Sequence, residues 1–115
     1  MRDLEAAVEA GDERATMVLD VYNYRIKKYI GAYAAAMGGV DIIVWTAGVG
    51  ENQTGTRLEA CSGLEFLGVK IDAEANKVRG EEAIISTPDS KVTVCVIPTD
   101  EELMIAKDTM NLLQK

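Results

Sequence analysis

The chain has 115 residues, which fits one small domain able to bury roughly two-thirds of its unfolded surface. Hydrophobic residues make up 48% and charged residues 27%, as in an ordinary soluble globular protein. The net charge of −7 argues against a nucleic-acid or anionic-membrane partner, and no apolar run approaches the roughly 20 residues that span a bilayer. There is no histidine, which excludes Ser-His-Asp and Cys-His catalytic groups and histidine-based zinc sites within this chain. Cys61 and Cys95 lie far apart in the sequence, which indicates reduced thiols and a cytoplasmic location.

The amino-terminal third of the chain is predicted to be helical. Residues 3–10 form a short helix that Gly11 terminates, and Asp12 can cap a long helix that ends near Met37, before two glycines. Apolar residues recur along this long helix at intervals of three and four positions, which predicts one buried stripe. The residues of this stripe are Ala15, Val18, Tyr22, Ile26, Tyr29, Tyr33 and Met37.

Residues 41–52, DIIVWTAGVGEN, combine a buried strand with a glycine turn. The apolar run Ile42–Trp45 predicts the strand, and Gly48 and Gly50 form the turn ahead of a helix. Glycine lets a ligand approach the backbone, and free N–H groups at a helix start favour anions. The pattern is not the G-x-G-x-x-G fingerprint, because the third glycine position is Gln53, and it is not a Walker A loop. Taken alone, it is equally consistent with a nucleotide seat and with a structural strand–helix connection.

The remaining predicted elements alternate between helices and strands. In chain order they are a helix over 54–65, a short strand over 67–71, a polar helical turn over 72–79, a short strand over 83–86, a turn over 87–90, a strand over 91–97 and a helix over 100–113. The first of these helices is expected to bury Leu58, Cys61 and Leu64, and the last to bury Leu103, Ala106, Met110 and Leu113. The strand KVTVCVI is apolar on both faces, as expected in a sheet covered by helices.

This order of elements predicts an α/β fold. The two long strands, 42–45 and 91–97, are connected through helices and are therefore expected to be parallel. The result is a thin, mostly parallel sheet flanked by helices, with at least one open strand edge that can pair with another chain. Residues 1–115 are predicted to form a single partial domain.

A second functional candidate, IPTDEEL, follows the other long strand. Thr99 as N-cap and Glu102 three residues later match a capping box, and the acidic first turn suits the helix dipole. This structural role leaves Glu101 unexplained. A carboxylate at the carboxyl end of a core strand, beside a nucleotide turn on another strand, is placed to bind magnesium. Spacing alone leaves both interpretations open.

Several long strings resemble the carboxy-terminal part of acetate kinases, in the same order and spacing over essentially the whole chain. They are IGAYAAAMGGV, DIIVWTAGVGENQ, LEFLGVKID, EEAIISTPDSKV and VIPTDEELMIAKDT. The resemblance implies the fold group of acetate and sugar kinases, Hsp70 and actin, with a ribonuclease-H-like ATPase domain whose first strands are missing here. It also implies magnesium-dependent transfer of a phosphoryl group between ATP and acetate, which gives ADP and acetyl phosphate.

The resemblance also implies site residues. In acetate kinases the strand-turn TAG-x-GEN holds the adenosine and the neighbouring phosphates. By position, the implied nucleotide-binding residues are Gly48, Val49, Gly50, Glu51 and Asn52. Glu101, the first glutamate of the IPT-x-EE string, is implied as the magnesium ligand. Arg2 matches the arginine of an Asp-x-Arg nucleotide contact whose aspartate would precede Met1.

Length limits what the chain is expected to do. Acetate kinases are several times longer, and their acetate pocket and phosphoryl-stabilising charges lie upstream, so no catalytic residue is assigned. The expected function is that of a cytoplasmic nucleotide-binding fragment of an acetate kinase, inactive alone. Its expected partners are ATP or ADP, the missing amino-terminal portion, and a second copy through the open strand edge. The alternative is a non-catalytic nucleotide-binding or self-associating remnant. The choice among acetate, propionate and butyrate depends on an acyl pocket outside this chain.

Overall fold

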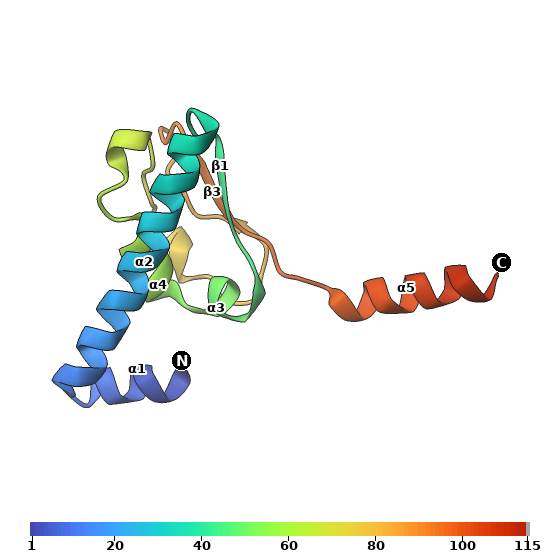
Figure 1. The fold of residues 1–115 in the computed structure, drawn as a ribbon, viewed down its shortest axis with the longest axis horizontal. Helices are drawn as coiled ribbons and strands as arrows, with labels where there is room; N and C mark the ends of the chain where they lie inside the picture. Colours follow the sequence, from blue (N-terminus) through green and yellow to red (C-terminus); the bar gives the residue numbers. More distant parts are fainter. Residues whose placement is uncertain (115) are drawn as a thin grey trace.

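The structure, a computed structural model, describes residues 1–114 as an α/β body from which the last helix projects (Figure 1). In chain order its elements are α1 (Arg2–Glu9), α2 (Glu13–Met37), β1 (Ile42–Trp45), α3 (Ala47–Asn52), α4 (Thr54–Cys61), the 3₁₀ helices η1 (Glu65–Leu67) and η2 (Ala75–Lys77), β2 (Ala83–Ile84), β3 (Thr93–Val96) and α5 (Glu101–Leu113). Within the described residues, no helix combines the length and the hydropathy that crossing a membrane requires.

The boundaries predicted for α2 are confirmed. The Asp12 carboxylate accepts hydrogen bonds from the backbone N–H groups of Arg14 (2.8 Å) and Ala15 (3.0 Å), as an N-cap does. At the other end Gly38 takes a left-handed φ of 77°, and its neighbour Gly39 donates back to the carbonyl of Ala34. The chain therefore leaves the helix at the predicted glycine pair.

The predicted buried stripe on α2 is wrong. Of its members only Ala15 is buried and Ile26 is half-buried against the core, whereas Tyr33 is 63% and Met37 67% exposed. The other members, Val18, Tyr22 and Tyr29, are exposed as well. The two eight-residue helices α1 and α4 both pack against this 25-residue helix but are too short to cover it, so a full-length stripe has no partner to bury it.

The sheet has the order β1-β3-β2. β1 and β3 are parallel with Ile43 opposite Val94, which confirms the prediction for the two long strands, and β2 adds an antiparallel edge. The strand predicted over 67–71 is not formed. A 3₁₀ turn occupies its start, Gly68 follows with a φ of 94°, and pairing is limited to one isolated bridge at Ile71. The positive φ at Gly68 breaks the extended conformation that a strand requires.

The hydrophobic core lies on one face of the sheet. Side chains alternate along each strand, so one face carries a row of buried residues that packs against α4 and the middle of α2. This row consists of Ile43, Trp45, Val94 and Val96. The opposite face is uncovered, with Ile42 58% and Val44 48% exposed. The expectation of helices on both sides of β3 is therefore corrected.

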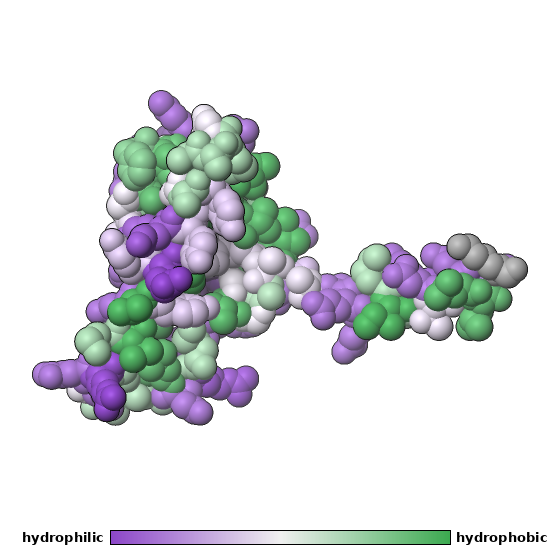
Figure 2. Space-filling model, viewed as in Figure 1, coloured by the Kyte–Doolittle hydropathy of each residue, from purple (hydrophilic) through white to green (hydrophobic). Residues whose placement is uncertain are grey.

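The last helix was expected to bury its apolar side, and this is wrong as well. Every residue described in α5 is exposed, including Leu103 (46%), Met110 (59%) and Leu113 (82%), and Ala106 is exposed too. The connector over 97–100 carries α5 away from the sheet (Figure 1). Figure 2 shows apolar side chains on the surface of both α5 and the body. In the described part of the chain no element covers α5, so its apolar side chains stay exposed.

Candidate functional site

The two segments singled out in the sequence meet at one edge of the sheet. β1 ends at Trp45 and β3 at Val96, and because these strands are parallel their carboxyl ends lie side by side. An open hollow of about 500 Å³ lies there, lined by Ala47, Gly48, Thr99, Asp100, Glu101 and Glu102. The structure thus brings Gly48 and Glu101 to one place, although 53 positions separate them in the chain.

The glycine segment after β1 is a short helix rather than an open turn. α3 begins immediately after Thr46, and Ala47 has a φ of 58° at its first position. A non-glycine residue in this conformation costs about 1–3 kcal/mol and persists only where the surrounding structure enforces it. Asn52 ends the helix, and its side-chain amide donates to the carbonyl of Gly48 (2.9 Å). The strained residue therefore turns the chain sharply from the strand into the helix at the edge of the hollow.

The two glycines of this segment have different surroundings. A Cβ added to Gly50 would lie 3.0 Å from the carbonyl carbon of Trp45, so glycine allows α3 to pack directly on β1. A Cβ added to Gly48 would meet no atom within 4 Å. Gly50 is thus needed for packing, while Gly48 leaves open backbone facing the hollow. Val49, between them, is half-buried.

Glu51 and Thr99 connect the two segments directly. Oε1 of Glu51 accepts hydrogen bonds from the backbone N–H of Thr99 (2.9 Å) and from its hydroxyl (3.2 Å). The capping box predicted for Thr99 and Glu102 is therefore wrong, because the Thr99 N–H that the Glu102 carboxylate would accept from already donates to Glu51. Asp100 is the N-cap of α5 instead, with Oδ1 accepting from the backbone N–H of Leu103 (3.0 Å).

Arg57 supports the site from inside the fold, and its role was not predicted from the sequence. Its side chain is fully buried and donates to the backbone carbonyls of Gly50 (2.8 Å) and Glu51 (3.0 Å) at the end of α3. It also donates to the side-chain and backbone oxygens of Asn76 (2.9 and 2.7 Å) and to the carbonyl of Val78 (2.6 Å). One guanidinium therefore ties α3 to α4 and to the loop that holds η2.

The charge of Arg57 is balanced by carbonyl and amide oxygens rather than by a carboxylate. Burial, and after it the positive charge of Arg79, lowers the pKa of the Arg57 guanidinium. The sequence does contain a signal that Arg57 faces the core, because it shares helical spacing with Ala60, Cys61 and Leu64. In the structure all four residues are buried. The predicted inner face instead contained Leu58, which is 41% exposed.

Of the three charged residues expected to bind ligand, Glu101 and Arg2 are exposed and Glu51 is half-buried. Glu101 lies on the first turn of α5 at the rim of the hollow. Among residues 1–114, no group of three or more acidic or cysteine side chains is placed to hold a metal ion. Magnesium commonly takes one or two carboxylates together with phosphate oxygens of a substrate, so Glu101 alone fits this ion only as part of a metal–nucleotide site. Arg2 lies on the first turn of α1, exposed, and does not line the hollow.

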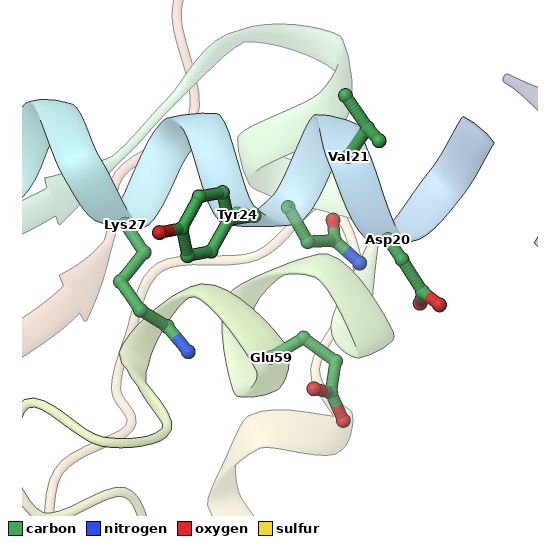
Figure 3. Close-up of a pocket in the computed structure, with 6 residues that line it drawn as sticks. Asp20, Val21, Tyr24, Lys27 and Glu59 are labelled. Carbon is green, nitrogen blue, oxygen red and sulfur yellow. The ribbon is translucent and has the colours of Figure 1, made fainter. Parts of the chain in front are cut away.

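A second hollow, of about 400 Å³, lies between α2 and α4 and is lined by Asp20, Val21, Asn23, Tyr24, Lys27 and Glu59 (Figure 3). Figure 3 shows Lys27 extending from α2 and Glu59 from α4. In the described part of the chain these two charges form no ion pair, and the buried Oδ1 of Asn23 has no hydrogen-bond partner. None of the residues singled out in the sequence as nucleotide or metal ligands lines this hollow.

Comparison with known proteins decides the family. A sequence model described as the Acetokinase family matches residues 1–107. The chain belongs to the acetokinase family. The acetate kinases of Parabacteroides distasonis and Phocaeicola vulgatus are 67% and 71% identical to it, and each alignment covers 100% of this chain and 29% of the relative. The resemblance stated from the sequence is thereby confirmed.

Solved structures confirm the α/β fold of this acetokinase-family chain. The crystal structure of Porphyromonas gingivalis acetate kinase superposes with a TM-score of 0.90 at 58% identity, over 97% of this chain and 28% of that one. The acetate kinase from Entamoeba histolytica gives a TM-score of 0.87 at 33% identity, over 99% of this chain and 30% of that one. The chain therefore spans about 29% of the length of the curated relatives it matches.

Proposed function

We propose that residues 1–115 form one partial domain, the carboxy-terminal nucleotide-binding part of an acetate kinase. The observation that carries this proposal is the hollow at the carboxyl ends of β1 and β3, where the backbone of Gly48 faces Glu101. Crevices outside the carboxyl ends of parallel strands are the usual ligand sites of α/β sheets. A cytoplasmic location fits the two free cysteines, and the net charge of −7 fits a protein that does not bind nucleic acid.

The proposed ligand is ATP or ADP. The segment Gly48, Val49, Gly50, Glu51 and Asn52 would hold it, with the open backbone at Gly48 allowing the closest approach. Glu101 would bind the magnesium ion that accompanies the phosphates. Arg2 lies outside the hollow. It would contact the nucleotide only if α1 moved towards the hollow or the bound nucleotide extended beyond it.

We further propose that the isolated chain does not turn over. Phosphoryl transfer depends on cationic groups that clamp the transferring group and on a positioned acceptor. Among the described residues the hollow is lined by three acidic side chains and by no cationic one, so it supplies no arginine or lysine that would clamp a transferring phosphoryl group. Acetyl-phosphate formation would then require the amino-terminal portion of an acetate kinase as partner. A magnesium- and acetate-dependent loss of ATP with the pure chain, abolished by Glu101→Gln, would contradict this proposal.

Calorimetric titration with ADP tests nucleotide binding. Gly48→Ala adds a methyl group where the fold has room but where the nucleotide is expected to approach, so binding should weaken by about tenfold or more. Gly55→Ala is the matched control, since a Cβ there also meets no atom within 4 Å and Gly55 lies outside the hollow. Equal ADP affinity in both variants, or no heat at millimolar ADP with the unchanged chain, would contradict the proposed nucleotide-binding site.

A second candidate function is self-association. In the described part of the chain β1 is an edge strand with only β3 beside it, and its outward side chains Ile42 and Val44 are 58% and 48% exposed. Open apolar edges pair with other chains, so a homodimer through β1 is the proposed state of the isolated chain. A chain that associates but binds no nucleotide would be a self-associating remnant rather than a nucleotide-binding part.

A further inference from the structure

The connector over 97–100 is held to the body at two places. The first is the end of the sheet, where the Ile97 N–H donates to the carbonyl of Trp45 (2.9 Å). The second is the pair of hydrogen bonds from Thr99 to Oε1 of Glu51. Among the described residues no other hydrogen bond joins residues 98–114 to the body, and α5 buries none of its side chains. Where Glu101 lies therefore depends on Glu51.

Glu51 is itself firmly placed. Its backbone carbonyl accepts from the Arg57 guanidinium (3.0 Å) and from the Gly80 N–H (3.1 Å), so the main chain at this residue is fixed from two sides. Its carboxylate then reaches the connector at a separation of 48 positions in sequence. A fixed main chain leaves little freedom for the carboxylate to move away from Thr99.

We propose that Glu51 is a positioning residue whose carboxylate fastens the connector, and with it the Glu101 carboxylate, at a set distance from the Gly48 backbone. This inference rests on the proposed nucleotide site and assigns Glu51 an action through Thr99. The two hydrogen bonds would keep the metal-binding carboxylate within reach of phosphates held at Gly48. Without them the connector from Pro98 onward has no fixed contact with α3.

Amide hydrogen exchange without nucleotide tests the contact. In the unchanged chain the Thr99 amide should exchange slowly for an exposed residue. Glu51→Ala should raise its exchange rate about tenfold or more, the effect of losing a hydrogen bond to a charged acceptor. Glu51→Gln keeps a side-chain oxygen acceptor and should restore much of the protection. The Ile97 amide, bonded within the sheet, is the internal control and should not change. Equal exchange at Thr99 in the unchanged chain and in Glu51→Ala would overturn the inference.

A second measurement tests the positioning role itself. The affinity for ADP is compared with and without magnesium, because a residue with a merely structural role would change both affinities alike. Glu51→Ala should lower the affinity measured with magnesium by a larger factor than the affinity measured without it, and Glu51→Gln should recover part of this difference. An undiminished gain in Glu51→Ala would overturn the positioning role. If the unchanged chain binds no ADP at all, the proposed nucleotide site fails and the positioning role fails with it, whereas the exchange of Thr99 still decides whether the contact exists.

Discussion

At the scale of single residues, Arg57 is the main polar support of the site. Five hydrogen bonds from one buried guanidinium satisfy four backbone carbonyls and the side-chain oxygen of Asn76, in two separate segments, 50–51 and 76–78. An arginine suits this position because its planar fork presents several donors in fixed directions. The segment 48–52 is thus held by Arg57 through the carbonyls of Gly50 and Glu51, and Gly50 lets it pack directly on β1.

Replacing Arg57 should destabilise the whole fold. Arg57→Met keeps much of the side-chain volume but leaves the carbonyls of Gly50, Asn76 and Val78 without their donor, so we expect about 3 kcal/mol less free energy of unfolding. Urea denaturation followed by the fluorescence of Trp45 measures this. Arg79→Met, at an exposed position, is the control and should change the free energy of unfolding by less than about 0.5 kcal/mol. Equal stability of the two variants would show that water replaces the guanidinium.

Cys61 gives the fold a dependence on alkaline pH. Burial raises the pKa of this thiol to about 11, against an ordinary value of 9.0, with partly offsetting effects of Trp45 and Lys27. Below pH 9 the thiol holds its proton in both folded and unfolded states and adds no pH dependence. Above pH 9 the unfolded chain ionises first, so the free energy of unfolding should fall towards pH 11, by about 2–3 kcal/mol.

The measurement is the slope of the free energy of unfolding against pH between 9 and 11. Cys61→Ala removes the titrating group, so its slope should be shallower than that of the unchanged chain even if the variant is less stable overall. Other groups titrate in this range, and for that reason only the difference between the two slopes is interpreted. Parallel slopes would mean that the Cys61 thiolate forms as easily in the folded protein as in the unfolded one.

At the scale of elements, short sequence patterns correctly predicted the ends of α2 and the positions of the two long strands, which depend on neighbouring residues. Asp12 and the glycine pair after Met37 set the ends of α2, and two apolar runs became the parallel strands β1 and β3. The same signals could not say which apolar faces find a partner. The residues from Leu103 to Leu113 have helical spacing and do form a helix, but burial depends on what packs against it, and nothing in the described chain does. The residues of a segment determine whether it forms a helix, whereas its burial depends on which other elements pack against it.

The candidate site likewise combines features that the sequence could predict with contacts that it could not. The positions of Gly48 and Glu101 at neighbouring strand ends follow from parallel strands, so their meeting could be predicted. The contact between Glu51 and Thr99 could not, because it joins side chain and backbone across 48 positions and competes with a plausible local capping box. Arg57 was missed for a related reason, since an arginine is rarely assigned to a helix face that faces the core.

The structure predicts that α5 contributes little to the stability of the body. Every described side chain that is removed by deleting residues 102–115 is exposed, and the Glu51–Thr99 contact remains, so the free energy of unfolding should change by less than about 1 kcal/mol. Urea denaturation with Trp45 as the probe compares the two chains. A clear loss of stability in the shortened chain would show that α5 packs on the body in solution.

At the scale of the whole molecule, the described residues leave apolar surface without cover in several places. Apolar side chains are exposed along α2, on the face of β1 opposite the core, and on α5, which extends the longest dimension of the molecule to 55 Å (Figure 1). The chain spans about 29% of the length of its relatives. The relatives therefore contain further residues that are available to pack against these surfaces. In the isolated chain the same surfaces are available to a second copy.

The open edge of β1 should therefore drive association, and a single charge should reduce it. Val44 is 48% exposed on β1, and lysine is a residue that natural edge strands use against pairing. We expect sedimentation velocity to show association of the unchanged chain that rises with concentration, and Val44→Lys to need about tenfold higher concentration for the same association. Leu112→Lys places the same charge on α5, at a position 69% exposed, and should have a smaller effect if β1 is the contact. A larger effect from Leu112→Lys would move the interface to α5, and a monomer at every concentration would contradict pairing through either surface.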